Sequence, residues 1–168
     1  MQVELHLPAE GVPGEPARPV VVDTNVALDL LIFSDPRTAP LRTLLAQGRL
    51  DWIATQVMRD ELERVLAYPH IVSRMDFYRV DAAQVLAAFD AQARLVDIAP
   101  RVAYVCKDAD DQKFIDLAAA HACPPPLHSP ATPQLPSVVL VSKDRAVLRL
   151  KKRLSTLGVW VGRAWPAG

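Results

Sequence analysis

The stretch Val20-Val21-Val22-Asp23-Thr24-Asn25 decides the fold of this chain. Three consecutive valines are typical of a short strand that is buried on both faces of a parallel sheet. The pattern changes after Asp23, because Asn25 is followed by apolar residues at helical spacing through Leu31. A buried strand that leads directly into a helix predicts an α/β domain, with Asp23 at the carboxyl end of a strand.

Strands and helices alternate along the rest of the chain. Short apolar runs predict strands at 18–22, 51–54, 95–98, 138–141 and 159–161. Helical periodicity predicts helices from Asn25 to the turn at 34–36, and at 40–47, 56–67, 81–94, 110–121 and 144–154. Thr55 is a candidate N-cap for the helix at 56–67, and Pro69 is expected to end that helix. Because parallel strands need crossover helices of this length, the order predicts a central parallel sheet with helices on both faces.

The chain is expected to form one domain, since 168 residues suffice to bury about two-thirds of the surface of the unfolded chain. Residues 1–18 contain three prolines and two glycines, so we expect an irregular N-terminal leader there and the domain at 19–168. The segment 123–136 contains six prolines and is expected to be a loop insertion, because proline lacks the backbone donor of helices and sheets. A tolerated surface insertion and a Pro-rich segment that docks a partner both fit this composition.

Composition favours a cytoplasmic protein. No stretch is uniformly apolar over the roughly 20 residues that a membrane-spanning helix needs, and the N-terminus lacks the basic segment and apolar core of a signal peptide. Cys106 and Cys123 form no Cys-x-x-Cys motif, so both are expected to stay reduced. The 19 basic residues balance 19 acidic ones, which argues against passive coating of nucleic acid but allows a local basic patch.

Four acidic residues stand out by their place in this pattern. Asp23 and Asp144 follow predicted strands, Asp111 lies in the first turn of a predicted helix, and Glu61 lies in the helix after the second strand. Carboxyl ends of parallel strands converge on one crevice, and clustered carboxylates repel one another unless a cation lies between them. Mg²⁺ and Mn²⁺ prefer oxygen ligands. The four acids therefore predict a metal-dependent phosphodiesterase.

Four segments also resemble, in order, the four motifs of the PIN-domain family: VVDTN at 21–25, MRDELERVL at 58–66, DADDQKFIDLA at 108–118 and VLVSKDRAVL at 139–148. The resemblance covers about Pro19 to Val161 and is nearest to the bacterial branch of toxin components of toxin–antitoxin systems. It implies a PIN-like (Rossmann-like) α/β/α sandwich and an acidic pocket that holds one or two Mg²⁺ or Mn²⁺ ions. One departure is Ala146, where many relatives carry a further acid.

The resemblance implies which acids do the chemistry. Asp23, Glu61, Asp111 and Asp144 match the family's first to fourth acids, which bind metal and act in catalysis. Asp111 is chosen as the third acid because the family acid stands three positions before a bulky apolar residue, here Phe114. Asp108 and Asp110 remain candidates for an additional ligand or a helix cap, and capping is favoured for Asp108.

Residues beside the acids are candidates for supporting roles. The hydroxyls of Thr24 and Ser142 and the amide of Asn25 could orient an acid or a bound water, or simply cap local backbone. Lys143 and Arg145 begin the most basic segment of the chain and could position phosphates, although such a run is also typical of a solvated helix face.

The resemblance further implies cleavage of single-stranded RNA by an endoribonuclease that acts as a toxin, with a small antitoxin protein as partner and a homodimer as the assembly. Two alternatives stay open on the same fold. One is a nuclease of RNA maturation or DNA repair. The other is a non-catalytic nucleic-acid-binding module, and the presence of all four acids counts against it.

Overall fold

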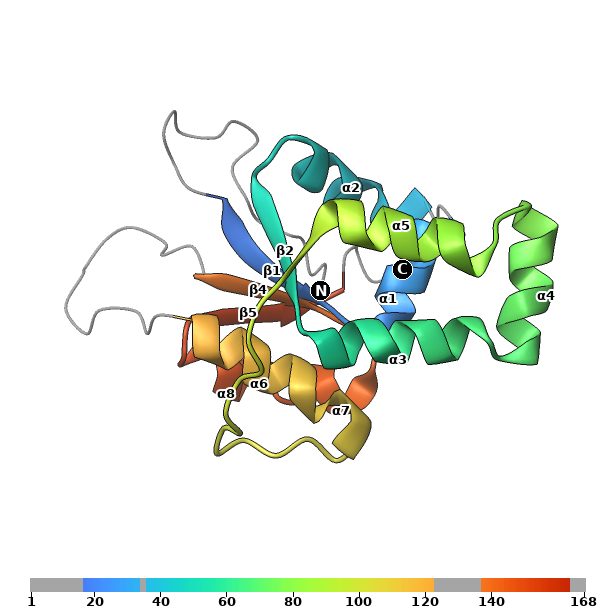
Figure 1. Cartoon of the computed structure of the whole chain (residues 1–168). Coiled ribbons are helices and arrows are strands. Elements are labelled where there is room, and N and C mark those ends of the chain that lie inside the picture. Colours follow the sequence, from blue (N-terminus) through green and yellow to red (C-terminus); the bar gives the residue numbers. More distant parts are fainter. Residues whose placement is uncertain (1–16, 34–35, 123–136, 164–168) are drawn as a thin grey trace.

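The computed structural model describes residues 17–33, 36–122 and 137–163 of the chain (Figure 1). Most of the expected leader at 1–18 and all of the expected Pro-rich loop at 123–136 lie outside the described residues. The strand that follows the leader begins at Arg18, where the apolar run of the sequence begins.

A five-stranded sheet forms the centre of the molecule. Its strands are β1 (Arg18–Val22), β2 (Leu50–Ala54), β3 (Ala93–Leu95), β4 (Val138–Val141) and β5 (Val159–Gly162). The order across the sheet is β3-β2-β1-β4-β5, and each neighbouring pair is parallel. The expected central parallel sheet is confirmed, and all five strands therefore end at the same edge.

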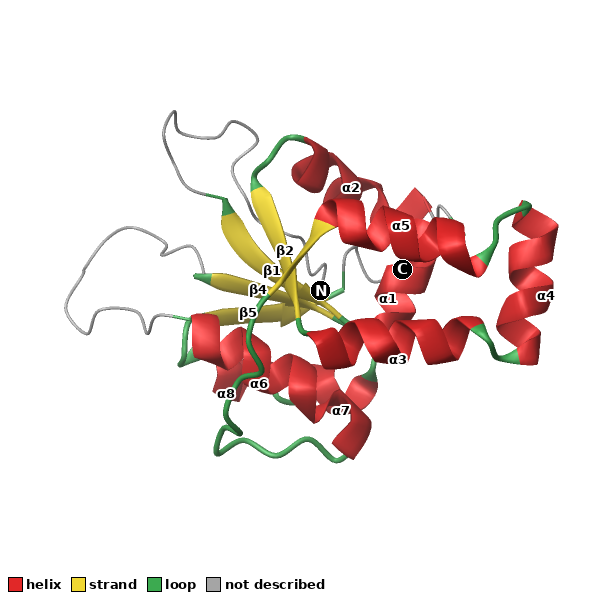
Figure 2. Cartoon of the chain, viewed as in Figure 1, coloured by secondary structure: helices red, strands yellow, loops and turns green. Residues whose placement is uncertain are grey.

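Helices cover both faces of the sheet, as the α/β/α expectation requires. Figure 1 shows α2 and α5 over one face and α6 and α8 over the other, and Figure 2 shows the same layers by type of structure. The described helices are α1 (Thr24–Leu31), α2 (Ala39–Ala46), α3 (Gln56–Leu66), α4 (Pro69–Tyr78), α5 (Ala82–Gln92), α6 (Gln112–His121), α7 (Arg145–Leu148) and α8 (Lys151–Ser155). Two short 3₁₀ turns, η1 (Pro36–Thr38) and η2 (Ala109–Asp111), precede α2 and α6.

The core lies between the sheet and its helices. Val21 and Leu140 in the central strands have no exposed surface, as the continuous apolar runs predict. Trp52 of β2 packs edge to face against Phe89 of α5, with ring centroids 5.2 Å apart. Thr55 caps α3 by accepting a hydrogen bond from the backbone of that helix, which confirms its expected role. Local sequence signals and burial therefore agree over most of the domain.

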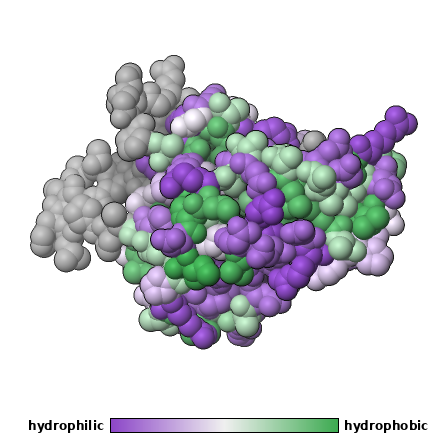
Figure 3. Space-filling view, viewed as in Figure 1, coloured by the Kyte–Doolittle hydropathy of each residue, from purple (hydrophilic) through white to green (hydrophobic). Residues whose placement is uncertain are grey.

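The surface drawn in Figure 3 mixes apolar and polar residues. Among the described residues, the most exposed large apolar side chains include Phe77 of α4 and Ile98 in the loop after β3. Single exposed apolar side chains are common on folded proteins, so we assign them no role. Within residues 17–33, 36–122 and 137–163, no helix has the length and apolar character needed to cross a membrane.

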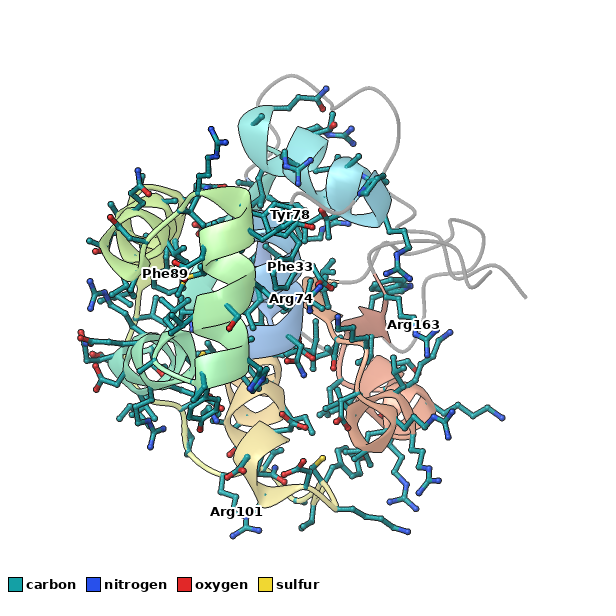
Figure 4. The ribbon with its side chains drawn as sticks, turned by 90° about the vertical axis from the view of Figure 1, so that its right-hand side faces the viewer. Phe33, Arg74, Tyr78, Phe89, Arg101 and Arg163 are labelled. Carbon is teal, nitrogen blue, oxygen red and sulfur yellow. The ribbon has the colours of Figure 1, made fainter. Side chains whose placement is uncertain are left out.

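Helix α4 is a correction to the sequence analysis, which assigned no element to residues 69–80. Helix α3 ends before Pro69 as expected, but Pro69 is also the first residue of α4. A proline at that position lacks only an N–H that would have no partner within the helix. Arg74 of α4 lies 4.0 Å over the ring of Phe33, and Tyr78 packs against the same ring (Figure 4). These contacts dock α4 against the end of α1.

The helix predicted at 144–154 is a second correction, because it is divided into α7 and α8. Leu150 donates its N–H to the carbonyl of Val147 (3.0 Å), which tightens the chain between the two helices. Val147, Leu150 and Leu154 are all buried. Their spacing of i, i+3 and i+7 places the three side chains on one face of the segment, and both α7 and α8 contact β5.

The strand predicted at 95–98 is a third correction, since β3 lies at 93–95. Helix α5 ends at Gln92, earlier than expected, and the strand begins directly after it. Val96 still donates its N–H to the carbonyl of Ala54 (2.8 Å), but Ile98 is 70% exposed and has left the sheet. An apolar run at a sheet edge does not by itself mark where the ladder ends.

The substitution Leu140→Ala tests the core. We expect it to lower the free energy of unfolding by about 2–5 kcal/mol, because it removes buried methyl groups and leaves a cavity. The control Leu95→Ala makes the same change in β3, where the side chain is 45% exposed, and should cost less than about 1 kcal/mol. Denaturant unfolding followed by circular dichroism measures both, and equal losses would contradict the assignment of Leu140 to the core.

Candidate metal centre

The register of the sheet places Asp23 beside Ser142. β1 pairs with β4 so that Val22 lies opposite Val141, and the next residue of each strand leaves the sheet at the same edge. The N–H of Asp23 donates to the carbonyl of Val141 (3.1 Å), which continues the ladder by one residue. The Ser142 hydroxyl donates to Asp23 Oδ2 at 2.5 Å, and both residues are buried. Two residues 119 positions apart thus meet at one edge of the sheet.

The first and fourth acids also start helices. Asp23 Oδ1 accepts the N–H of Val26 (2.8 Å) and caps α1, and Asp144 Oδ1 accepts the N–H of Ala146 (2.7 Å) and caps α7. The N–H of Asp144 donates to Ser142 Oγ at 3.1 Å. One buried hydroxyl therefore links the side chain of Asp23 to the backbone of Asp144 and fixes the two acids relative to each other.

Three acids approach one another closely enough to share a cation. Asp108, Asp111 and Asp144 each offer a carboxylate oxygen, and these oxygens lie within 4.8 Å of one another. Asp108 caps η2 by accepting the N–H of Asp110 (3.0 Å), so the expected cap is confirmed and the same residue adjoins the other acids. Asp111 stands at the start of α6 without a side-chain capping bond, which leaves its carboxylate to face the pocket.

The crowding of these acids is visible in the pKa of Asp111, which rises from 3.8 to about 7. Burial is the largest cause, and the negative charges of Asp144, Asp108 and Asp23 add to it in that order. Lys113 acts in the opposite direction. The carboxyl group of Asp111 therefore keeps its proton up to about neutral pH, because it is partly buried and has three acids as neighbours.

The pKa of Asp23 is raised as well, although hydrogen bonds oppose part of the shift. Burial raises the pKa of Asp23, while the bonds from Ser142 and the backbone of Val26 and the charge of Lys143 lower it. The backbone N–H of Lys143 also donates to this carboxylate. Donors on both oxygens hold the Asp23 side chain in one orientation.

A buried polar pair on α6 fixes the loop that leads to Asp108. Gln112 accepts the N–H of Cys106 (2.7 Å) and donates to the carbonyl of Tyr104 (3.0 Å) and to Asp116 (2.9 Å). Asp116 also accepts the N–H of Val102 at 3.0 Å. The first turns of α6 thereby set the path of the backbone just before the acids.

Glu61 lies outside the group of three. Its carboxylate on α3 is bound by Lys113, with Nζ 2.6 Å from Oε2, and Lys113 also donates to the carbonyl of Asp110. Because Lys113 also lowers the pKa of Asp111, Glu61 adjoins the other acids through this ammonium group. Direct metal binding by Glu61 stays a prediction.

The predicted supporting residues lie around the same edge. Thr24 is the first residue of α1 and half-buried, while Asn25 is exposed. Asp110 is exposed beside Asp108. Of these neighbours of the acids, Ser142 has the clearest structural part, because its hydroxyl joins Asp23 to Asp144.

The two predicted phosphate contacts differ in their surroundings. Lys143 Nζ lies 2.6 Å from Asp29 Oδ2 on α1, so part of its charge is already compensated. Arg145 is exposed as the first residue of α7. Figure 4 shows the molecule from the edge at which the strands end. In this view Arg101 lies at the bottom and Arg163 at the right, so these two basic residues are not neighbours. Contact of Lys143 or Arg145 with substrate stays a prediction.

Several polar residues of the site were not singled out from the sequence: Asp29, Gln112, Lys113 and Asp116. Asp29 had a usable signal, because it is a charged residue within the apolar run of α1 and is buried. The other three lie inside the segment DADDQKFIDLA but gave no signal of their own. Their partners lie on separate loops or helices, which one sequence does not reveal.

Comparison with known proteins agrees with this geometry. A model of the PIN domain family (PIN_3) matches residues 19–124, more than half of the chain. A search of curated proteins finds no match. Asp144 lies beyond the matched residues, and the structure connects it to the first acid through Ser142. PIN domains are generally metal-dependent nucleases. By the family match and by its parallel sheet flanked by helices, the chain belongs to the PIN domain family.

Proposed function

We propose that this protein is a Mg²⁺- or Mn²⁺-dependent endoribonuclease that cleaves single-stranded RNA. The observation that carries the proposal is the convergence of Asp108, Asp111 and Asp144, with Asp23 close enough to raise the pKa of Asp111. Membership of a nuclease family supports the reaction class.

The residues fit a hard divalent cation. Each member of the group offers a carboxylate oxygen, which is the ligand type that Mg²⁺ and Mn²⁺ prefer. Burial and the charges of Asp144, Asp108 and Asp23 raise the pKa of Asp111, and a bound cation would favour its charged form. The thiol of Cys106 adjoins the acids, but burial raises its pKa, so it offers no thiolate that would favour a softer metal. Asp111, Asp144 and Asp108 would hold the ion, with Asp23 beside them.

When bound, such a cation lowers the pKa of a coordinated water and offsets negative charge on the scissile phosphate. The chain itself supplies orientation. Ser142 and the N–H of Val26 hold both oxygens of Asp23, so this side chain keeps its direction as the charge of the pocket changes. Asp111 can hold a proton at its carboxyl group near neutral pH. Arg145, exposed next to Asp144, is placed to contact a phosphate of the RNA backbone.

We also propose that the protein acts as the toxin of a toxin–antitoxin pair with a small antitoxin as partner, which the resemblance of its four motifs to toxin components supports. We further propose that the chain assembles as a homodimer, as in that branch of the family. A role in RNA maturation or DNA repair would use the same pocket. The choice of substrate therefore separates these roles better than the geometry of the acids does.

Asp111→Asn tests the reaction. Asn is nearly isosteric and Asp111 makes no side-chain capping bond, so we expect the fold to be kept while Mg²⁺-dependent cleavage falls on the order of 100-fold. Asp23 is a poorer choice because an amide would place a donor against the N–H of Lys143 or the Ser142 hydroxyl. Cleavage of a labelled single-stranded RNA measures the effect.

The matched control is Asp110→Asn, which removes an exposed negative charge one residue away and should change the rate less than about threefold. Equal losses in both variants would contradict the assignment of Asp111. The same assay with structured RNA and with flapped DNA tests the alternatives. Preferred cleavage of either would replace the single-strand assignment by a maturation or repair role, and binding without cleavage would indicate a non-catalytic module.

The raised pKa of Asp111 predicts how stability depends on pH without metal. The folded protein holds this proton more tightly than the unfolded chain, in which the pKa is near 3.8, so the stabilisation is present below about pH 4 and is lost as pH rises through about 7. We expect the melting temperature in EDTA to fall between pH 5 and pH 8, and to fall less in Asp111→Asn. Mg²⁺ should raise it more at pH 8, because the cation binds deprotonated carboxylates. An unchanged pH profile in the variant would contradict the site.

Production of the chain in bacterial cells tests the toxin role. We expect induction of the wild-type protein to stop growth, and induction of Asp111→Asn to leave growth intact at equal protein levels, because the RNA substrate is no longer cut. Growth curves with immunoblots measure this. Continued growth with an enzyme that is active in the test tube would remove the toxin role and keep the nuclease.

A further inference from the structure

Lys113 occupies an unusual place between two sets of acids. It is the second residue of α6, two positions after Asp111. Its Nζ lies 2.6 Å from Glu61 Oε2 and also donates to the carbonyl of Asp110. The exposed fractions of the Lys113 and Glu61 side chains are only 24% and 19%. The ammonium group is thus held by two partners in a largely covered position.

The positive charge of Lys113 acts on two acidic side chains, Asp111 and Glu61. It lowers the pKa of Asp111 on one side, and it is in contact with Glu61 on the other. Glu61 therefore already has an ammonium group 2.6 Å from its buried Oε2, in an ion pair that is not also a hydrogen bond. A divalent ion at the Glu61 carboxylate would have to displace this ammonium or lie directly beside it, and like charges at such distances repel strongly.

From these contacts we infer that Lys113 takes the place of a second metal ion. The pocket then binds one divalent cation at Asp108, Asp111 and Asp144, and Glu61 is a positioning residue that holds Lys113 rather than a metal ligand. This inference rests on the proposed metal-dependent nuclease function. The pattern of acids in the sequence allows one or two metal ions, and this inference selects one.

A purely structural salt bridge between α3 and α6 would explain the same contact. The two interpretations differ in the number of ions bound. Loss of a structural bridge lowers stability and leaves the stoichiometry at one. Loss of a built-in cation frees Glu61 and the space beside Asp111 for a second divalent ion.

The experiment counts Mn²⁺ bound to the full chain by calorimetric titration and by electron paramagnetic resonance up to 1 mM Mn²⁺ (about 10³ times a micromolar Kd). We expect one ion per chain in the wild type and two in Lys113→Met. Lys113→Arg keeps the positive charge and should bind one. The double variant Lys113→Met with Glu61→Gln should return to one, because the second ion needs the Glu61 carboxylate.

Arg59→Met is the matched control for a lost positive charge. Arg59 also lies on α3 and bridges Asp90 at 2.7 Å, so its removal breaks a bridge of similar length and is expected to leave one ion bound. If Arg59→Met bound two ions, the number of bound ions would depend on the total charge of the protein and not on the position of Lys113. That result would overturn the inference.

The electron paramagnetic resonance spectrum of the wild-type protein with Mn²⁺ tests the inference even if a variant fails to fold. A mononuclear six-line signal at saturation supports the inference, and a spin-coupled pair of ions overturns it. One ion in a folded Lys113→Met protein also overturns it while the nuclease proposal stands. Failure of the wild type to bind any ion would instead remove the metal centre on which both proposals rest.

Discussion

The hydrogen bond between the Ser142 hydroxyl and Asp23 is the contact on which the site depends. It exists because the valine strands β1 and β4 are neighbours in one register and end together at the same edge. The same hydroxyl accepts the N–H of Asp144, so the position of the fourth acid follows from that of the first. The pairing of two apolar strands therefore sets the positions of Asp23 and Asp144, while the loop held by Gln112 and Asp116 leads to Asp108 and Asp111.

Lysine side chains, rather than solvent, compensate two of the acidic side chains at this edge of the sheet. Lys143 binds the buried Asp29 of α1, and Lys113 binds Glu61 of α3, each at 2.6 Å. Both lysines are near neighbours in sequence of a pocket acid, and both reach a helix that follows a different strand. Each pair thus ties the segment of a pocket acid to a helix that follows another strand, while burial and the neighbouring acids still raise the pKa of Asp111. Repulsion among buried carboxylates opposes folding. The packing of the apolar core must therefore contribute the free energy that offsets this repulsion.

Much of the fold could be predicted because its signals are local. The apolar runs gave β1 and β4 with their observed bounds, and Thr55 marked the start of α3 by its capping hydroxyl. Helix α4 was missed because Pro69 both follows one helix and begins another, and local pattern does not distinguish these uses. The pairing of Glu61 with Lys113 was missed for a different reason. It joins residues 52 positions apart, and only the approach of α3 to the first turn of α6 in the folded chain brings them together.

The unbalanced charge of the pocket also limits what it can bind. A neutral ligand would leave the repulsion among Asp108, Asp111 and Asp144 in place, and an anion would increase it. Lys113 and Lys143 are not free to relieve this repulsion fully, because each ammonium group is already bound to another carboxylate. A small cation with a high charge relieves the repulsion most. The phosphate of a nucleic acid can then approach an edge that would otherwise repel it, so the ion and the substrate are linked by the same electrostatic requirement.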